Sequence, residues 1–175
     1  MKNSSFIRGA VQISLFSALI ACAAFFSFPI FSVPITLQSL AVFLALFILG
    51  TKRGTIAVIL YVLLGIVGLP VFSGFSGGIG RILDIGGGFI FGFCVLAITY
   101  SLSLKVFGKS NASKIISALI GQAALYACGV AWYVIMFDGD FWYAVYAFVL
   151  PFVLLDLGKI VLAFVIAKKI KKLIK

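Results

Sequence analysis

The chain has 175 residues, of which 64% are hydrophobic and only 10% are charged, and its mean hydropathy is +1.30. Soluble domains are roughly 45–50% apolar and about 25% charged, so this composition excludes a soluble globular domain. The net charge of +10 does not indicate nucleic-acid binding, because the basic residues form short clusters between apolar runs, a pattern typical of membrane topology.

The apolar runs predict six transmembrane helices, since a bilayer core requires about 20 apolar residues per helix. The first run has the order of a signal peptide, but it is too long and similar runs follow it. The second and third runs are short. We therefore expect an all-α, polytopic integral membrane protein, a single domain over residues 1–175, with spans near residues 8–28, 37–50, 54–69, 85–106, 114–137 and 151–167.

The basic residues predict the orientation, because Lys and Arg concentrate in short cytoplasmic loops. The external loops then contain Arg81 together with Asp84, Asp138 and Asp140. The internal segments contain most of the 14 basic residues: Lys2, Arg8, Lys52, Arg53, Lys105, Lys109, Lys114, Lys168, Lys169, Lys171, Lys172 and Lys175. We expect both termini to be cytoplasmic.

The segment from Gly65 to Gly88, between the third and fourth spans, is too rich in glycine to be a regular helix throughout. It is also apolar, and irregular backbone at membrane depth is tolerated where protein buries it or where it lines a cavity. We expect a loop folded over or into the outer mouth of the bundle. The alternative is a flexible external loop.

The sixth run contains the two remaining charges, Asp156 and Lys159. A charge at the centre of a membrane helix costs about 2.5–3.5 kcal/mol on insertion scales. A spacing of three places both on one helix face. The alternatives are a structural ion pair and a functional site, and function is the default for intramembrane charges.

Pro151 suits the first turn of a helix, so the sixth helix begins there or continues, kinked, from about Phe141. In the first case the segment Trp142–Tyr146 lies at the outer interface, where Trp and Tyr are enriched.

A stripe of small residues, Ser14, Ala18 and Cys22, follows the first helix at a spacing of four, with Ser17, Ala21 and Ala24 beside it. Such a stripe allows close approach of another helix, either within the protein or in a partner.

Several kinds of chemistry are not expected. The three cysteines stand alone in apolar segments and the chain has no His, so we expect no metal site or disulfide. It also has no Glu and only one intramembrane carboxylate, so no catalytic pair is expected.

Five segments resemble the BioY family, the biotin-specific substrate-binding subunits of energy-coupling factor transporters. They are Val33-Pro-Ile-Thr-Leu-Gln38, Gly50-Thr-Lys-Arg-Gly54, the run from Tyr61 to Phe72, Gly87-Gly-Phe-Ile-Phe-Gly92, and the run from Pro151 to Lys159. The order of the motifs makes the match specific.

The resemblance implies a multi-pass protein of a prokaryotic cell membrane that captures biotin from outside. It implies a membrane-embedded coupling protein and two ATPases as partners, no cofactor, and no enzymatic activity in this chain. It also favours a partner contact for Ser14, Ala18, Ala21 and Cys22.

Biotin offers a carboxylate, a ureido group and an apolar ring and chain. We expect Asp156 to accept a ureido N–H and Lys159 to bind the carboxylate or balance Asp156, with Arg81 as a second candidate for the carboxylate. The expected ligand-binding set is completed by Thr36, Gln38, Tyr61, Phe72, Asp84, Gly87, Phe89 and Trp132. Two other functions remain open: a membrane scaffold without a ligand, and a proton-driven vitamin transporter.

Overall fold

The computed structural model describes residues 2–28 and 33–173, with side chains from Ser5 onward, so the side chain of Lys2 and all of Lys175 lie outside the description. The elements in chain order are α1 (Lys2–Phe25), β1 (Ser27–Phe28), β2 (Ile35–Thr36), α2 (Gln38–Ile66), α3 (Ile79–Leu83), α4 (Gly87–Phe107), α5 (Asn111–Phe137), α6 (Phe141–Phe148) and α7 (Leu150–Leu173).

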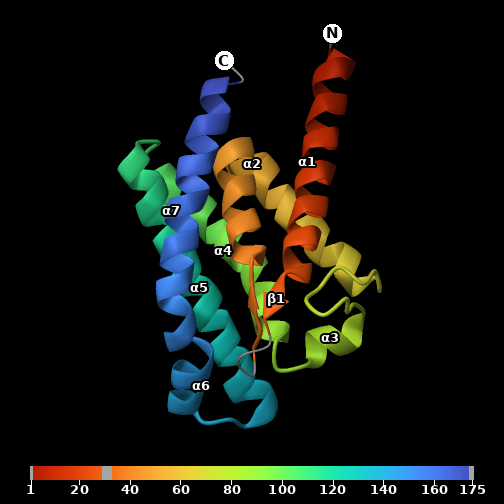
Figure 1. Ribbon diagram of the computed structural model, residues 1–175, viewed down its shortest axis with the longest axis vertical. Helices are drawn as coiled ribbons and strands as arrows, with labels where there is room; N and C mark the ends of the chain where they lie inside the picture. Colours follow the sequence, from red (N-terminus) through yellow and green to blue (C-terminus); the bar gives the residue numbers. More distant parts are fainter. Residues whose placement is uncertain (1, 29–32, 174–175) are drawn as a thin grey trace.

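Within the described residues, five helices are long and apolar enough to cross a membrane: α1, α2, α4, α5 and α7. The second and third predicted spans both belong to α2. Gly50 has non-helical dihedral angles, φ 81° and ψ 179°, and divides α2 into two arms. Figure 1 shows that α2 turns there and runs back beside itself. The arms pack so closely that a Cβ atom at Gly54 would lie 2.9 Å from the carbonyl oxygen of Ala45.

The long helices form one bundle in which both described chain ends lie at the same end (Figure 1). Helix α4 packs along α5, and α2 contacts α1, α4 and α7. Small residues allow these approaches, as in membrane helices generally. A Cβ atom at Gly121 of α5 would lie 2.9 Å from the carbonyl oxygen of Leu96 on α4.

The all-α expectation omitted two short strands. Strands β1 and β2 pair antiparallel, with Ser27 opposite Thr36, and connect α1 to α2. Pairs this short carry too little period-two alternation to be recognised in sequence.

The predicted interfacial segment is itself a helix, α6. Asp140 caps it by accepting a hydrogen bond from the backbone N–H of Tyr143 at 2.7 Å. Helix α7 begins at Leu150, so Pro151 lies in its first turn, which is the first of the two alternatives, although only Val149 separates α7 from α6. Trp142 and Tyr146 are exposed.

The glycine-rich segment runs from the end of α2 through α3 to α4 and inserts Phe72 into the bundle. The Phe72 ring fills the space that the missing Cβ of Gly65 leaves, and it packs edge-to-face on Tyr61 with centroids 5.6 Å apart. The segment therefore forms part of the wall of the cavity described below.

Candidate ligand-binding site

A cavity with about 680 Å³ of empty space, counted out to its open mouth, lies among α2, α4, α5, α6, α7 and the glycine-rich segment. The lining residues are Val33, Pro34, Thr36, Gln38, Ser39, Tyr61, Phe72, Ser73, Arg81, Gly86, Phe89, Ile90, Phe93, Gln122, Leu125, Tyr126, Phe148, Phe152, Asp156 and Lys159.

The carboxylate of Asp156 is the hub of the polar contacts in this cavity. Its Oδ1 accepts hydrogen bonds from Ser39 Oγ and Lys159 Nζ, both at 2.9 Å. Its Oδ2 accepts from Gln122 Nε2 at 2.9 Å and from the Tyr126 hydroxyl at 2.6 Å. A carboxylate has about four acceptor positions, so these four donors satisfy it fully.

Lys159 is equally well satisfied. Besides Asp156, its ammonium donates to the backbone carbonyl of Thr36 at 2.8 Å and to Ser39 Oγ at 3.2 Å. An ammonium has three donors, and all three are used. The side chains of Asp156 and Lys159 are 7% and 12% exposed, so this is a buried, mutually neutralised pair. Of the two predicted roles for Lys159, the structure shows the balancing of Asp156.

Two buried polar atoms at the cavity have no hydrogen-bond partner within the described part of the chain, Gln122 Oε1 and Arg81 Nε. The other nitrogens of Arg81 are engaged: Nη1 pairs with Asp84, and Nη2 contacts Ser73 Oγ at 3.5 Å. An unpaired buried polar group costs about 1–3 kcal/mol. A ligand that supplied a donor to Gln122 and an acceptor to Arg81 would relieve that cost.

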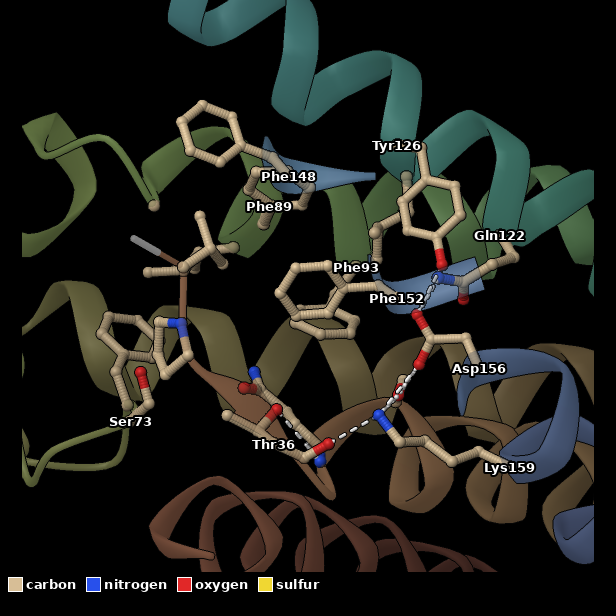
Figure 2. Close-up of a pocket in the computed structure, with 18 of the residues that line it drawn as sticks. Thr36, Ser73, Phe89, Phe93, Gln122, Tyr126, Phe148, Phe152, Asp156 and Lys159 are labelled. Carbon is tan, nitrogen blue, oxygen red and sulfur yellow. Dashed lines mark hydrogen bonds and ion pairs between the residues drawn. The ribbon is translucent and has the colours of Figure 1, made fainter. Parts of the chain in front are cut away.

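Apolar rings separate these two polar regions. Figure 2 shows Ser73, the neighbour of Arg81, at one side of the pocket and the Asp156 network at the other, with Phe93 and the polar residue Thr36 between them. Phe89 packs edge-to-face on Phe148 with centroids 6.4 Å apart. The cavity thus suits an elongated ligand with an anionic or acceptor group at one end, an apolar middle, and donor groups at the other.

Eight of the predicted ligand-binding residues line the cavity: Thr36, Gln38, Tyr61, Phe72, Arg81, Phe89, Asp156 and Lys159. The other three lie outside the lining. The Asp84 side chain is 49% exposed, and the backbone carbonyl of Asp84 accepts a hydrogen bond from Trp132 Nε1 at 3.2 Å. Gly87 packs against the backbone of Ile82, where a Cβ atom would clash.

The sequence predictions missed Ser39, Gln122 and Tyr126, the uncharged donors to Asp156. One sequence feature does point to two of them. Gln122 and Tyr126 are four residues apart in an apolar run and therefore share a helix face. No group of three or more His, Cys, Asp or Glu side chains suited to a metal ion occurs in the described ranges.

The small-residue stripe of α1 faces away from the bundle. Ser14, Ala18 and Cys22 are exposed, whereas Ser17 and Ala24 are 2% and 0% exposed and face α2. Helix α1 therefore has two faces of small residues. One packs inside the bundle, and the other is exposed in the described part of the chain.

Comparison with known proteins identifies the family. The family model described as "BioY family" matches residues 1–175. The biotin transporter BioY of Thermotoga maritima is 41% identical over 95% of this chain and 98% of its own length. BioY2 of Lactococcus lactis subsp. cremoris, a biotin transporter, is 31% identical over 93% of this chain and 88% of its own.

A crystal structure of the S-component for biotin from an ECF-type ABC transporter superposes with a TM-score of 0.88 at 26% identity. The match covers 98% of this chain and 95% of that one, so the whole bundle is shared. The chain belongs to the BioY family.

Proposed function

We propose that this chain captures biotin from outside the cell with high affinity, as the substrate-binding subunit of an energy-coupling factor transporter. It is not an enzyme: ATP hydrolysis belongs to two separate ATPase subunits. Membership in a family of biotin transporters supports this proposal. The observation that carries it is the cavity with two polar regions separated by aromatic rings.

Biotin has the matching order of groups. Its carboxylate lies at the end of an apolar chain, and its ureido group lies at the far side of the fused rings. We assign the carboxylate to Arg81, because the unpartnered Nε offers a charged donor, whereas every donor of Lys159 is used within the protein. We assign a ureido N–H to Gln122 Oε1, the acceptor of this network that has no partner among the described residues.

In this assignment Asp156 and Lys159 mainly preorganise the site. The pair holds Ser39, Gln122 and Tyr126 in fixed positions before the ligand arrives. Preorganisation lowers the entropy that binding must overcome, and it is one way for a small ligand to reach high affinity.

We also propose that the chain crosses the prokaryotic cell membrane six times with both termini in the cytoplasm. The two arms of α2 then count as two crossings, joined at Gly50, with Lys52 and Arg53 at the cytoplasmic face. Lys114 near the start of α5 and the lysine-rich end of α7 fit the same side. Helix α3, which carries the lining residue Arg81, then lies toward the outer end of the bundle, opposite the chain termini.

The partner surface in this proposal is the exposed stripe Ser14, Ala18 and Cys22 of α1, with Ala21 at its edge. Small residues permit a helix of the coupling protein to approach closely. That protein would connect this chain to its ATPases.

The direct test is equilibrium binding of labelled biotin to the purified chain in detergent, with thiamine as a control vitamin. We expect nanomolar affinity for biotin and no competition by thiamine. Absence of biotin binding at micromolar concentrations by a folded chain would refute the proposal.

A further inference from the structure

A second cavity lies at the end of the bundle where the chain termini lie, far from the biotin cavity. It has about 380 Å³ of empty space, and its polar rim is formed by Asn111 and Lys114 of α5 and by Lys168 and Lys171 of α7. Lys168 follows Lys159 by nine residues, which is about 13 Å along a helix at 1.5 Å per residue. The two cavities are therefore separate sites.

Three cations converge on this cavity without a counter-ion from the acidic side chains. The sequence has four acidic residues. Asp156 pairs with Lys159, and Asp84 pairs with Arg81. Asp138 and Asp140 lie in the connection between α5 and α6, at the end of the bundle opposite this cavity. In the described ranges, Lys114, Lys168 and Lys171 make no hydrogen bond or ion pair with protein, and Lys114 and Lys171 interact electrostatically with each other. Among the described residues, the rim thus has no anion to neutralise its lysines.

The floor of the cavity is apolar. Phe47 and Ala167 are 4% and 3% exposed, and Phe164 packs edge-to-face on Phe47 with centroids 5.9 Å apart. The N-terminus of the 27-residue helix α5, at Asn111, adds the positive end of a helix dipole to the rim. A positive rim over an apolar floor, at the end of a membrane bundle, matches the boundary between a phospholipid headgroup and its acyl chains.

We propose that this cavity binds the phosphate of an anionic phospholipid, with Lys114, Lys168 and Lys171 as its ligands and the acyl chains along Phe47 and Phe164. The bound lipid would come from the cytoplasmic leaflet, toward which basic ends of membrane proteins point. It would connect one end of α5 to one end of α7. Helix α5 carries Gln122 and Tyr126 of the biotin cavity, and α7 carries Asp156 and Lys159.

The test is native mass spectrometry of the purified chain titrated with dioleoyl phosphatidylglycerol or dioleoyl phosphatidylcholine. We expect tighter binding of phosphatidylglycerol. A juxtamembrane lysine contributes about fivefold to binding of anionic lipid, so the double variant Lys168→Gln/Lys171→Gln should weaken it on the order of 25-fold. The matched control is Lys169→Gln/Lys172→Gln, which removes the same charge from the same helix outside the cavity. Because these two lysines do not line the cavity, the control should weaken binding much less than the cavity variant does.

Several outcomes would overturn the proposal: equal loss in both double variants, unchanged lipid binding in the cavity variant, or, in a parallel titration with pyrophosphate, tighter binding of pyrophosphate than of phosphatidylglycerol. A cavity variant that keeps its lipid but loses copurifying coupling protein would point to a protein partner instead. Biotin affinity serves as the folding control, because neither double variant touches the biotin cavity.

Discussion

At the scale of single residues, Asp156 is the group on which most polar contacts of the proposed biotin cavity depend. Replacing it by Asn leaves Lys159 buried without its counter-ion and sets an amide N–H₂ against donors from Gln122 and Tyr126. Breaking a buried ion pair from one side costs about 3–5 kcal/mol. Asp156→Asn should therefore lower the thermal unfolding midpoint in detergent and weaken biotin binding.

The matched control for that change is Asp138→Asn. Asp138 is exposed and has φ 50°, a left-handed conformation that Asn tolerates as well as Asp. The thermal unfolding midpoint and the biotin affinity of Asp138→Asn should stay at wild-type values. If Asp156→Asn behaved like Asp138→Asn, the network would have no role in stability or binding.

Arg81 allows the assignment of the biotin carboxylate to be tested with a modified ligand. A hydrogen bond to a charged group contributes about 1.5–3 kcal/mol, which corresponds to roughly 10–150-fold in affinity. Arg81→Gln should weaken biotin binding by that factor. The wild type should bind biotin methyl ester as weakly as Arg81→Gln binds biotin. Arg81→Gln should bind the ester and biotin with the same affinity.

Isothermal titration with both ligands measures this cycle. Arg53→Gln is the matched control, since Arg53 is exposed and contacts Gln12 on α1 rather than the cavity. If the ester still bound much more weakly than biotin to Arg81→Gln, another group, with Lys159 the first candidate, would hold the carboxylate.

At the scale of elements, apolar runs predicted most of the helices because a membrane span is defined by length and hydrophobicity alone. The predicted span 114–137 corresponds to α5 (Asn111–Phe137), and 85–106 corresponds to α4 (Gly87–Phe107). The charges between residues 50 and 54 placed the turn of α2 correctly. The close packing of its two arms depends on the contact of Gly54 with the backbone of Ala45, which no local pattern in the sequence indicates.

The site was only partly predictable for a related reason. A buried charge in an apolar run is conspicuous in sequence, which is why Asp156 and Lys159 were found. Uncharged Gln122 and Ser39 acquire their roles only when α5 and α2 are brought against α7. Trp132 was placed in the cavity wall because it is aromatic, but the rotation of α5 directs its indole to Asp84.

The turn of α2 makes a prediction about helix packing. A Cβ atom at Gly54 would lie 2.9 Å from both the Ala45 carbonyl oxygen and the Leu46 Cα, which are backbone atoms that cannot move aside. Overpacking costs about 1–3 kcal/mol. Gly54→Ala should lower the thermal midpoint, whereas Gly158→Ala on α7, where nothing lies within 4 Å, should leave it unchanged or raise it. Equal effects at both positions would argue against close packing of the two arms.

At the scale of the whole molecule, the proposed six crossings can be tested by cysteine labelling in intact cells. In a background with Cys22, Cys94 and Cys128 replaced by Ala, one new cysteine is introduced at a time. Lys52→Cys at the turn of α2 should resist a membrane-impermeant maleimide until the cells are opened, because that turn is cytoplasmic in this topology. Leu83→Cys on α3 is exposed and should react in intact cells. Labelling of Lys52→Cys from outside would reverse the arrangement of α2.

The exposed surface of this chain should control its assembly with a coupling protein. The exposed stripe of α1 permits close approach only while its side chains remain small. Ala18→Trp should reduce copurification with the coupling protein and ATPases by about 5–150-fold, since overpacking an interface costs about 1–3 kcal/mol. Biotin affinity should not change, because Ala18 does not line the biotin cavity.

Leu19→Trp is the matched control, as Leu19 is also exposed on α1 but lies off the stripe, about 100° further round the helix, and already has a large side chain. It should assemble almost as well as the wild type. If Ala18→Trp assembled normally while Leu19→Trp did not, the partner would contact the large apolar face of α1. Loss of assembly together with loss of biotin binding would instead indicate a folding defect, which the thermal midpoint would reveal.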